Sequence, residues 1–366
     1  MISDSDRRYL AAAVELAQGG LYSATPNPRV GCLVVKGGTV VGRGFHQRTG
    51  GPHAEVNALA DAAGAAAGAT VYVSLEPCAF AGRTPACTGA LMEAGVGRVV
   101  VAMVDPHPQV SGEGIAALRR AGIDVDVHEL PEAQTLNVGY TSRITRGRPW
   151  VRLKSALSLD GRTGMASGES QWITGPAARA DVQYWRARSC AIVSGSGTLL
   201  ADDARLSVRD AAYAVGDEVR QPLRVVADSA LQLPATAAVL AEPGAVLVAH
   251  AGIAEPHLAD VEHICLPTDA GGAAPKVDLA ALLDELGRRG CNEVLVEAGA
   301  GLLGAFIAAD LWDEMLLYVA PKLLGSQARP LAELPFAAMA EAVVGRITDC
   351  VAIGDDLRLH LGRADG

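Results

Sequence analysis

The residues with the most distinctive chemistry in this chain are one histidine and two cysteines, His53, Cys78 and Cys87. One imidazole and two thiolates form a soft ligand set that suits zinc. Three protein ligands leave the fourth tetrahedral position for water, as in catalytic rather than structural zinc sites. Glu55, two residues after His53, is a poor fourth ligand but is well placed to move a proton between that water and a substrate nitrogen. The pattern therefore predicts a hydrolytic zinc site.

The residue types match the signature of zinc nucleobase deaminases, H-x-E followed by P-C-x-x-C, but the spacing of the cysteines departs from it. Eight residues, 79–86, separate the two cysteines here instead of two, and the loop that they form carries a cation, Arg83. The alternative interpretation is that the cysteines are buried apolar thiols and that His53 only begins a helix. A Pro-Cys pair after a predicted strand, at the expected distance downstream, disfavours that alternative.

The composition predicts a cytoplasmic protein of two domains. The chain has 366 residues, half of them hydrophobic, which is enough for two packed cores. We find neither a secretory signal nor an apolar stretch long enough to span a bilayer. Seven scattered cysteines, an odd number, favour a reducing compartment. Residues 1–148 carry 13 Lys+Arg and 13 Asp+Glu, so the net charge of −10 lies in the rest of the chain. Neither half has the basic face typical of nucleic-acid binders.

Hydrophobic periodicity predicts strands that alternate with helices in both halves, which indicates two three-layer α/β domains. In residues 1–146 we expect a helix over 4–18, a hairpin over 30–45, a helix that Pro52 opens, and strands over 69–75, 98–104 and 124–127. Both parts of the zinc site then fall at strand-to-helix junctions. Residues 143–149 are short, basic and contain Gly and Pro, and we interpret them as a linker. The second domain covers 150–366.

A second group of residues with chemical potential lies in the second half. Residues 299–304, Gly-Ala-Gly-Leu-Leu-Gly, match G-x-G-x-x-G after a strand, where glycines let backbone N–H groups approach a pyrophosphate. A tight, Ala-rich strand–helix junction would look the same, and the motif is not in the first βα unit that a Rossmann fold requires. Lys154 within an apolar strand and Glu297 at the end of another need a partner or a function.

Motifs spread along the whole chain resemble those of the bifunctional deaminase–reductase family of riboflavin biosynthesis. In the first half these are Asn-Pro-Arg-Val-Gly (27–31), His-Ala-Glu-Val (53–56), Leu-Glu-Pro-Cys (75–78), Gly-Arg-Thr-Pro-Ala-Cys (82–87) and Asp-Pro-His-Pro (105–108). In the second half they are Leu-Lys-Ser-Ala-Leu-Ser-Leu-Asp-Gly-Arg (153–162), Ser-Gly-Glu-Ser-Gln-Trp-Ile-Thr (167–174), Leu-Ala-Asp-Asp (200–203), Val-Glu-Ala-Gly (296–299) and Ala-Pro-Lys-Leu-Leu-Gly (320–325).

The resemblance implies a cytidine-deaminase-like first domain and a dihydrofolate-reductase-like second domain. The first would remove the 2-amino group of 2,5-diamino-6-(ribosylamino)-4(3H)-pyrimidinone 5′-phosphate, with zinc on His53, Cys78 and Cys87 and with Glu55 as the proton shuttle. The second would use NADPH to reduce the ribosyl group to ribityl, with Lys154 at the reaction centre.

The resemblance also implies two sets of binding residues. The cofactor-binding positions would be Ala156, Trp172, Thr198, Asp202, Ser229 and the loop Gly299, Ala300, Gly301, Leu302, Leu303, Gly304 and Ala305. The substrate-binding positions would be Asn27, His46 and Asp105, Arg83 and Thr84 for the phosphate, and, in the reductase, Ser170, Arg186, Leu206, Arg209 and Glu297.

The chain departs from the family pattern in three places. Ala79-Phe80 replaces Ser-His, so one deaminase substrate contact changes. Asp202-Asp203-Ala204 replaces Asp-Asp-Pro, which loosens a turn. Ala300 stands where proline or a second glycine is usual. None of these changes removes a proposed catalytic group.

Two other functions compete with this interpretation. The first is a deaminase that acts on a nucleic acid such as tRNA and carries an appended domain. Such an enzyme would need a basic face, which the chain lacks. A zinc module without enzyme activity would want a fourth strong ligand, and only Glu55 is near. We therefore expect a small phosphorylated pyrimidine as partner, with no nucleic acid and no membrane. The sequence leaves a homo-oligomer open.

Overall fold

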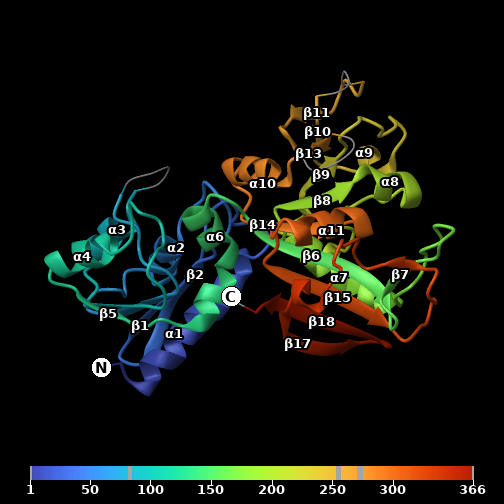
Figure 1. Cartoon of the computed structure of the whole chain (residues 1–366). Helices are drawn as coiled ribbons and strands as arrows, with labels where there is room; N and C mark the ends of the chain where they lie inside the picture. Colours follow the sequence, from blue (N-terminus) through green and yellow to red (C-terminus); the bar gives the residue numbers. More distant parts are fainter. Residues whose placement is uncertain (1, 81–84, 253–256, 270–274, 365–366) are drawn as a thin grey trace. The chain divides into compact units, whose positions relative to one another are not determined.

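The chain folds into two compact units, Met1–Gly147 and Arg148–Gly366 (Figure 1). The computed structural model describes residues 2–80, 85–252, 257–269 and 275–364. Each unit has a twisted sheet with helices packed on both of its faces, so the fold is mixed α/β in both halves. Among the described residues, no helix combines the length and the apolar character needed to cross a lipid bilayer.

The first unit is built on a five-stranded sheet with the order β2-β1-β3-β4-β5. Its strands are β1 (Gly31–Lys36), β2 (Thr39–Phe45), β3 (Thr70–Val73), β4 (Arg98–Val101) and β5 (Asp124–Val127). Strand β1 is antiparallel to both neighbours, whereas β3, β4 and β5 are parallel. The hairpin turns at Gly37 and Gly38, both with positive φ, as a two-residue turn of this kind requires.

Helices cover both faces of this sheet because β1 alternates its apolar side chains between them. Cys32 and Val34 face one core, and Leu33 and Val35 face the other. The helices are α1 (Asp4–Ala17), α2 (Ala54–Asp61), α3 (Cys87–Glu93), α4 (Glu113–Arg120), α5 (Pro131–Leu136) and α6 (Val138–Arg146). Residues of α2, α3 and α4 line the first core, and residues of α1 and α5 line the second.

The second unit has a nine-stranded sheet with the order β11-β10-β9-β8-β14-β6-β15-β18-β17. Its strands are β6 (Trp150–Ser158), β8 (Ala191–Gly195), β9 (Leu223–Ala227), β10 (Val246–His250), β11 (Glu262–Cys265), β14 (Glu293–Glu297), β15 (Glu314–Ala320), β17 (Gly345–Ile353) and β18 (Asp356–Arg363). All neighbours from β11 to β15 are parallel, and β18 and β17 are added antiparallel at one edge. Two short ribbons complete the unit: β7 (Arg162–Gly164) with β16 (Arg329–Pro330), and β12 (Thr268–Asp269) with β13 (Lys276–Val277).

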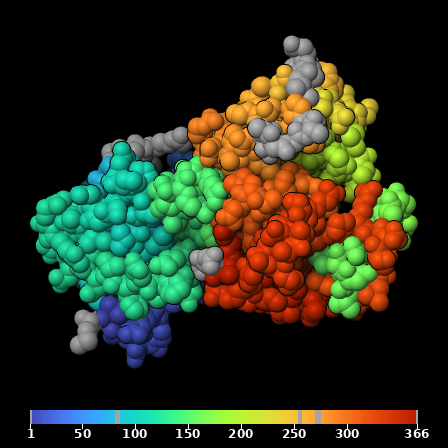
Figure 2. All heavy atoms as spheres, in the orientation of Figure 1, coloured from blue at the N-terminus to red at the C-terminus, as the bar shows by residue number. Residues whose placement is uncertain are grey.

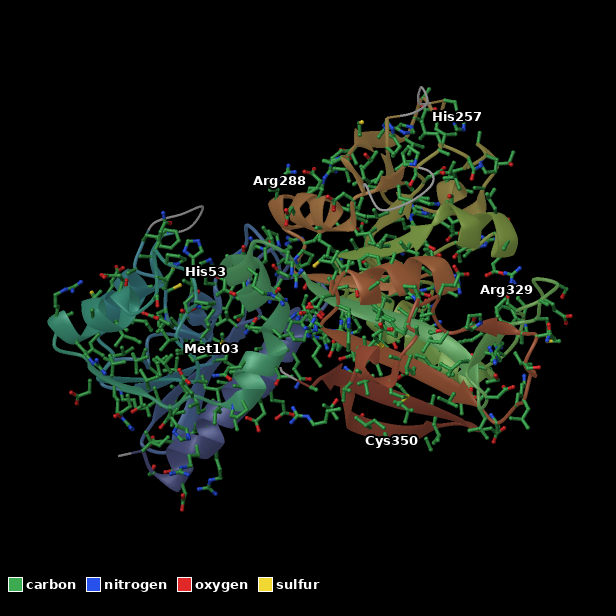
Figure 3. All side chains as sticks on the ribbon, in the orientation of Figure 1. His53, Met103, His257, Arg288, Arg329 and Cys350 are labelled. Carbon is green, nitrogen blue, oxygen red and sulfur yellow. The ribbon has the colours of Figure 1, made fainter. Side chains whose placement is uncertain are left out.

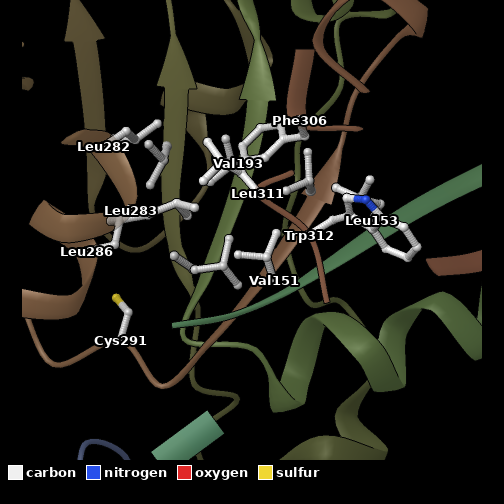
Figure 4. Packing of buried hydrophobic residues seen from close by; sticks show 14 of the residues in the cluster. Val151, Leu153, Val193, Leu282, Leu283, Leu286, Cys291, Phe306, Leu311 and Trp312 are labelled. Carbon is white, nitrogen blue, oxygen red and sulfur yellow. The ribbon is translucent and has the colours of Figure 1, made fainter. Parts of the chain in front are cut away.

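Two helical layers bury the central strands of this sheet. The helices are α7 (Pro176–Arg188), α8 (Ser196–Asp202), α9 (Ala238–Ala241), α10 (Leu279–Arg288) and α11 (Ala300–Ala308). Figure 4 shows one layer, in which Leu282 and Leu286 of α10 and Phe306 of α11 pack over Val151 and Val193. All five residues of β14 are buried, as expected for a parallel strand covered on both faces.

Two expectations need correction, and one element was not anticipated. Helix α2 begins at Ala54, so Pro52 precedes the helix and His53 is its N-cap. Residues 143–146 are not part of a linker, because they form the last turn of α6, which ends at Gly147 with φ of 75°. The antiparallel hairpin β17–β18 was not anticipated. Its first strand is mostly exposed and lacks the apolar run that marked the buried strands.

Candidate active sites

The three predicted metal ligands converge in the first unit. His53 is the N-cap of α2, Cys78 lies in the loop after β3, and Cys87 is the first residue of α3 (Figure 3 labels His53). His53 Nδ1 lies 3.1 Å from Cys87 Sγ and 3.6 Å from Cys78 Sγ, and all three ligand atoms lie within 4.8 Å of one another. A tetrahedral zinc ion with its usual bond lengths would separate such atoms by roughly 3.5 Å. The donor types and the spacing therefore fit zinc.

The pKa values of the two cysteine thiols shift in opposite directions. A hydrogen bond from the Cys87 thiol lowers the pKa of Cys78 to about 4, with His53 contributing in the same direction. The same bond to Cys78 and burial raise the pKa of Cys87. One thiolate is thus already favoured before a cation binds. A metal ion would replace the shared proton and hold both sulfurs as thiolates.

Glu55 lies in the first turn of α2 and is 3% exposed. Burial raises the pKa of its carboxyl group to about 7, although His53 and Cys87 oppose that rise. A carboxyl group with a pKa near neutrality can both accept and return a proton, which is the property of a general acid–base catalyst.

Asn27 and His46 are linked beside this centre. Asn27 Nδ2 lies 3.0 Å from His46 Nε2, and His46 Nδ1 lies 3.1 Å from the Pro52 carbonyl oxygen. Burial lowers the pKa of His46, which favours the neutral ring. A neutral ring can donate Nδ1–H to Pro52 and accept the Asn27 amide at Nε2. His46 is 2% exposed, so of this pair it is the partly buried Asn27 that has surface left to offer a substrate.

Asp105 is held in place by Glu76, a residue that the sequence analysis quoted only as part of a motif. The Glu76 carboxylate accepts hydrogen bonds from the backbone N–H groups of Asp105, Gly112 and Ile115, at 3.2, 3.0 and 3.1 Å. The Asp105 carboxylate accepts from the Tyr140 hydroxyl at 3.1 Å. Burial raises the pKa of Asp105, and the hydrogen bonds to it oppose the rise. Glu76 therefore connects the segment that contains Cys78 to the loop that contains Asp105.

The loop between the cysteines is only partly described. Arg83 and Thr84, the expected phosphate contacts, lie outside the described residues. Phe80, which replaces the family histidine, is 42% exposed, and its ring centroid lies 6.3 Å from that of His107.

In the second unit, Glu297 is the centre of a charged cluster. Arg186 of α7 binds it with two hydrogen bonds, Nε to Oε1 at 2.6 Å and Nη2 to Oε2 at 2.9 Å. Lys154 Nζ lies 3.9 Å from Glu297 Oε2, so these two charged strand residues, each of which needed a partner, lie beside one another. Burial would raise the pKa of Glu297, but Arg186 and Lys154 outweigh it and lower the pKa to about 2. Burial lowers the pKa of Lys154, and Glu297 opposes that shift.

The loop 206–209 is attached to this cluster through Arg186, whose Nη1 donates to the Ser207 carbonyl oxygen at 3.1 Å. The backbone N–H of Arg209 donates to Gln183 at 2.8 Å, and burial together with Arg186 lowers the pKa of Arg209. Leu206 is 2% exposed and belongs to the hydrophobic core, so its side chain is unsuited to contact a substrate.

The glycines of the loop 299–304 have different structural roles. Gly299 is the N-cap of α11, and its N–H donates to Thr198 Oγ1 at 3.0 Å. A Cβ on Gly304, by contrast, would lie 2.2 Å from the Glu333 carbonyl oxygen. Packing against residue 333 is therefore what requires glycine at 304. Leu303 is 2% exposed within the core, whereas Ala300 and Leu302 are partly buried and Gly301 and Ala305 are exposed.

The remaining predicted cofactor positions belong to separate segments. Ser170 donates to the Asp202 carboxylate of α8 at 2.9 Å, and Trp172 is 63% exposed beneath the guanidinium group of Arg179. Ser229 follows β9 and accepts the Val277 N–H at 3.0 Å. Ala156 lies on β6, two residues beyond Lys154.

Comparison with known proteins identifies both halves of the chain. Residues 3–103 match the family described as the cytidine and deoxycytidylate deaminase zinc-binding region, and residues 149–358 match the RibD C-terminal domain. The riboflavin biosynthesis protein RibD of Escherichia coli (strain K12) is 46% identical, over 97% of this chain and 99% of that protein. The protein of the same name from Haemophilus influenzae is 45% identical, over 98% and 97%.

Solved structures agree with these relatives. RibD of Acinetobacter baumannii has a TM-score of 0.91 and 45% identity, over 98% of both chains. A protein of Thermotoga maritima described as a diaminohydroxyphosphoribosylaminopyrimidine deaminase/5-amino-6-(5-phosphoribosylamino)uracil reductase has a TM-score of 0.88 and 30% identity, over 98% of this chain and 99% of that one. The chain belongs to the RibD family, the bifunctional enzymes of riboflavin biosynthesis that combine a zinc-dependent deaminase with an NADPH-dependent reductase.

Proposed function

We propose that residues 1–146 deaminate 2,5-diamino-6-(ribosylamino)-4(3H)-pyrimidinone 5′-phosphate and that residues 150–366 reduce the ribosyl group of the product to ribityl. The observation that carries the first assignment is the convergence of His53, Cys78 and Cys87 beside a buried carboxyl group whose pKa is about 7. The lack of a basic face, with a balanced charge in residues 1–148, argues for a small substrate and against a nucleic acid.

In the deaminase, His53, Cys78 and Cys87 hold the metal and Glu55 moves protons. When bound, zinc lowers the pKa of its water ligand from 15.7 to about 7 and so supplies a nucleophile at neutral pH. Glu55 accepts a proton from the attacking water and returns it to the departing 2-amino group, which leaves as ammonia. Asn27, oriented by His46, and Asp105, held through Glu76, fix the pyrimidine edge. Arg83 and Thr84 receive the 5′-phosphate.

In the reductase, Lys154 is the general acid, and Arg186 orients Glu297 beside it. Bound NADPH supplies the hydride that goes to C1′ of the ribose. The C1′–O4′ bond breaks, and O4′ must then take up a proton, which the Lys154 ammonium group donates. Glu297 lies 3.9 Å from that ammonium group and is itself fixed by Arg186, so the donor is held in one place. Ser170, Arg186, Arg209 and the backbone at Leu206 contact the substrate, and Ala156, Trp172, Thr198, Asp202, Ser229 and the loop 299–305 contact the cofactor.

The proposed location is the cytoplasm, with no nucleic-acid or membrane partner. All seven cysteines are free of disulfides, and both Cys265 and Cys350 are exposed as thiols. Exposed thiols persist in a reducing compartment, which supports this location.

We also propose that the protein is a homo-oligomer in which a second copy covers strand β17. This strand is the outer edge of its sheet and is exposed along most of its length. Figure 2 shows the C-terminal part of the chain, in red, over much of the visible surface of the second unit. Val344 just before the strand is 70% exposed, Ile347 within it is 59% exposed, and Cys350 is exposed beside them (Figure 3). An apolar, unpaired edge is a surface on which another strand can pair.

Opposite charges on β17 favour a second copy of the same strand as the occupant. Arg346 and Asp349 lie on either side of an irregularity at residues 347–349, and Arg358 contacts Asp349 at 3.4 Å. Antiparallel β17 strands that cross there would bring each arginine near the partner's aspartate. Ile347→Lys should reduce the assembly to the 37.6 kDa monomer in light-scattering chromatography. Val127→Lys, at an exposed valine in the other unit, should not change the mass. An oligomer that survives Ile347→Lys would reject this interface.

Cys78→Ala should abolish zinc binding, because two remaining ligands cannot hold the ion against dialysis. The unmodified protein should contain about one zinc per chain by elemental analysis, as a single three-ligand site requires. Cys265→Ala removes an exposed thiol of the other unit and should leave the zinc content unchanged. Undiminished zinc in Cys78→Ala would overturn the ligand assignment.

Glu55→Gln should slow deamination by roughly 10²–10⁴-fold or more, because glutamine keeps the size but cannot accept and return a proton. Ammonia release from the diaminopyrimidine substrate measures the effect. The same variant, given the deaminated pyrimidine and NADPH, should oxidise NADPH at the normal rate. Glu113→Gln, at an exposed position, is the matched control. Equal losses in both reactions would show that the two chemistries share a site or a conformational step.

Lys154→Met should reduce the rate of ribosyl reduction by orders of magnitude, of the size expected for a lost general acid or more, while NADPH still binds. Methionine keeps most of the apolar stem and removes the charge. Stopped-flow NADPH oxidation measures the chemical step, and calorimetric titration measures cofactor binding. Lys36→Met, at an exposed lysine of the first unit, is the control. Near-normal turnover would mean that Lys154 is only the structural partner of Glu297.

A further inference from the structure

Lys322, in the loop that follows β15, makes a direct contact with the segment that carries Trp172. Its ammonium group donates a hydrogen bond to the Trp172 backbone carbonyl oxygen at 2.7 Å, across 150 residues of sequence. Both side chains are exposed, so neither belongs to the hydrophobic core. The contact is not explained by packing, and Lys322 has no part in the Lys154–Glu297–Arg186 cluster.

The backbone from which Lys322 projects is fixed on the neighbouring strand. At the ends of β6 and β15, Ala320 pairs with Ser158, and the Leu159 N–H donates to the Lys322 carbonyl oxygen at 2.8 Å. The Asp160 carboxylate then accepts the N–H groups of residues 324 and 325, at 3.1 and 2.8 Å. These bonds fasten the loop on both sides of Lys322, so the reach of its side chain is set by the sheet.

The segment at the far end of the contact is tied to two other elements. The Ser170 hydroxyl donates to Asp202 of α8 at 2.9 Å. Arg179 of α7 donates to the Thr174 carbonyl oxygen at 2.7 Å, and its guanidinium carbon lies 4.5 Å from the centroid of the Trp172 ring. Residues 170–174 are therefore held by α8 at one end and by α7 at the other. Between these two attachment points, Lys322 contacts the segment at the carbonyl group of Trp172.

We propose that Lys322 is a positioning residue of the reductase, whose ammonium group holds Trp172 and Ser170 in the arrangement that receives NADPH and the sugar phosphate. This inference rests on the assignment of those two residues to the reductase site. A segment that is already ordered loses less conformational entropy when a ligand binds. Without the tether only a fraction of molecules has the competent arrangement, and the apparent Kd rises by the inverse of that fraction.

The experiment compares Lys322→Met with Lys322→Arg in the full chain. Losing a charge-assisted hydrogen bond at an exposed site should raise the Kd and the KM for NADPH about tenfold and leave kcat within about twofold, because binding is weakened equally before and during the reaction. Lys322→Arg keeps a cationic donor and should restore both constants to within about threefold of the unmodified values. Calorimetric titration gives Kd, and NADPH oxidation gives KM and kcat.

Three results would overturn the proposal. The first is an unchanged Kd in Lys322→Met. The second is a loss confined to kcat. The third is a fall in thermal midpoint together with a loss of deaminase activity, which would mark Lys322 as a general structural residue. Lys36→Met, an exposed lysine of the other unit, should change none of these quantities.

A Trp172→Ala variant distinguishes a failure of the Lys322 proposal from a failure of the assignment of Trp172 to the cofactor site. If Trp172→Ala weakens NADPH binding but Lys322→Met does not, Trp172 contacts the cofactor and only the tether is rejected. If neither variant weakens binding, the assignment of Trp172 to the cofactor site fails and the proposal fails with it.

Discussion

A carboxyl group removed from water must take up a proton, lie beside a cation or accept hydrogen bonds, and the two candidate active sites differ in which of the first two they use. Glu55 is buried with no guanidinium or ammonium partner among the described residues, and burial raises its pKa to about 7. Glu297 is buried against Arg186 and Lys154, and its pKa falls to about 2. The first carboxyl group can exchange protons at neutral pH. The second stays ionised and can only orient the cations around it.

A second network of buried ion pairs lies next to the Glu297 cluster in the same sheet. Arg152 precedes Lys154 by two residues on β6, so both side chains lie on one face of the sheet. Arg152 is 2% exposed, and it pairs with Glu293 at 3.1 Å and with Glu314. Arg188 donates to the same Glu293 at 2.8 Å. Removing one partner of such a network leaves a buried charge unpaired, which costs about 3–5 kcal/mol, so this network makes a rigid base for the reductase site.

Local sequence was sufficient where a residue's type and its immediate neighbours carry the signal. The hairpin at Gly37-Gly38 was predicted because only a few residue types tolerate two successive positive φ angles. His53, Cys78 and Cys87 were predicted as a ligand set because a His-x-Glu motif followed by a Pro-Cys pair and a second cysteine has few other uses. Lys154 and Glu297 were recognised because charges in buried strands are rare, and they do lie together.

By itself, the sequence determined the two α/β halves, the metal ligands and the charged residues that need partners, because each depends on residue type and short spacing. Only the tertiary structure decided that 143–146 finish a helix, that Gly304 is glycine because of the backbone at 333, and that Leu206 is core. The same holds for Glu76 with the Asp105 loop and for Lys322 with Trp172. Those contacts join residues 29 and 150 positions apart. No local periodicity encodes such pairs, because they form only when the sheet brings the ends of different strands to one edge.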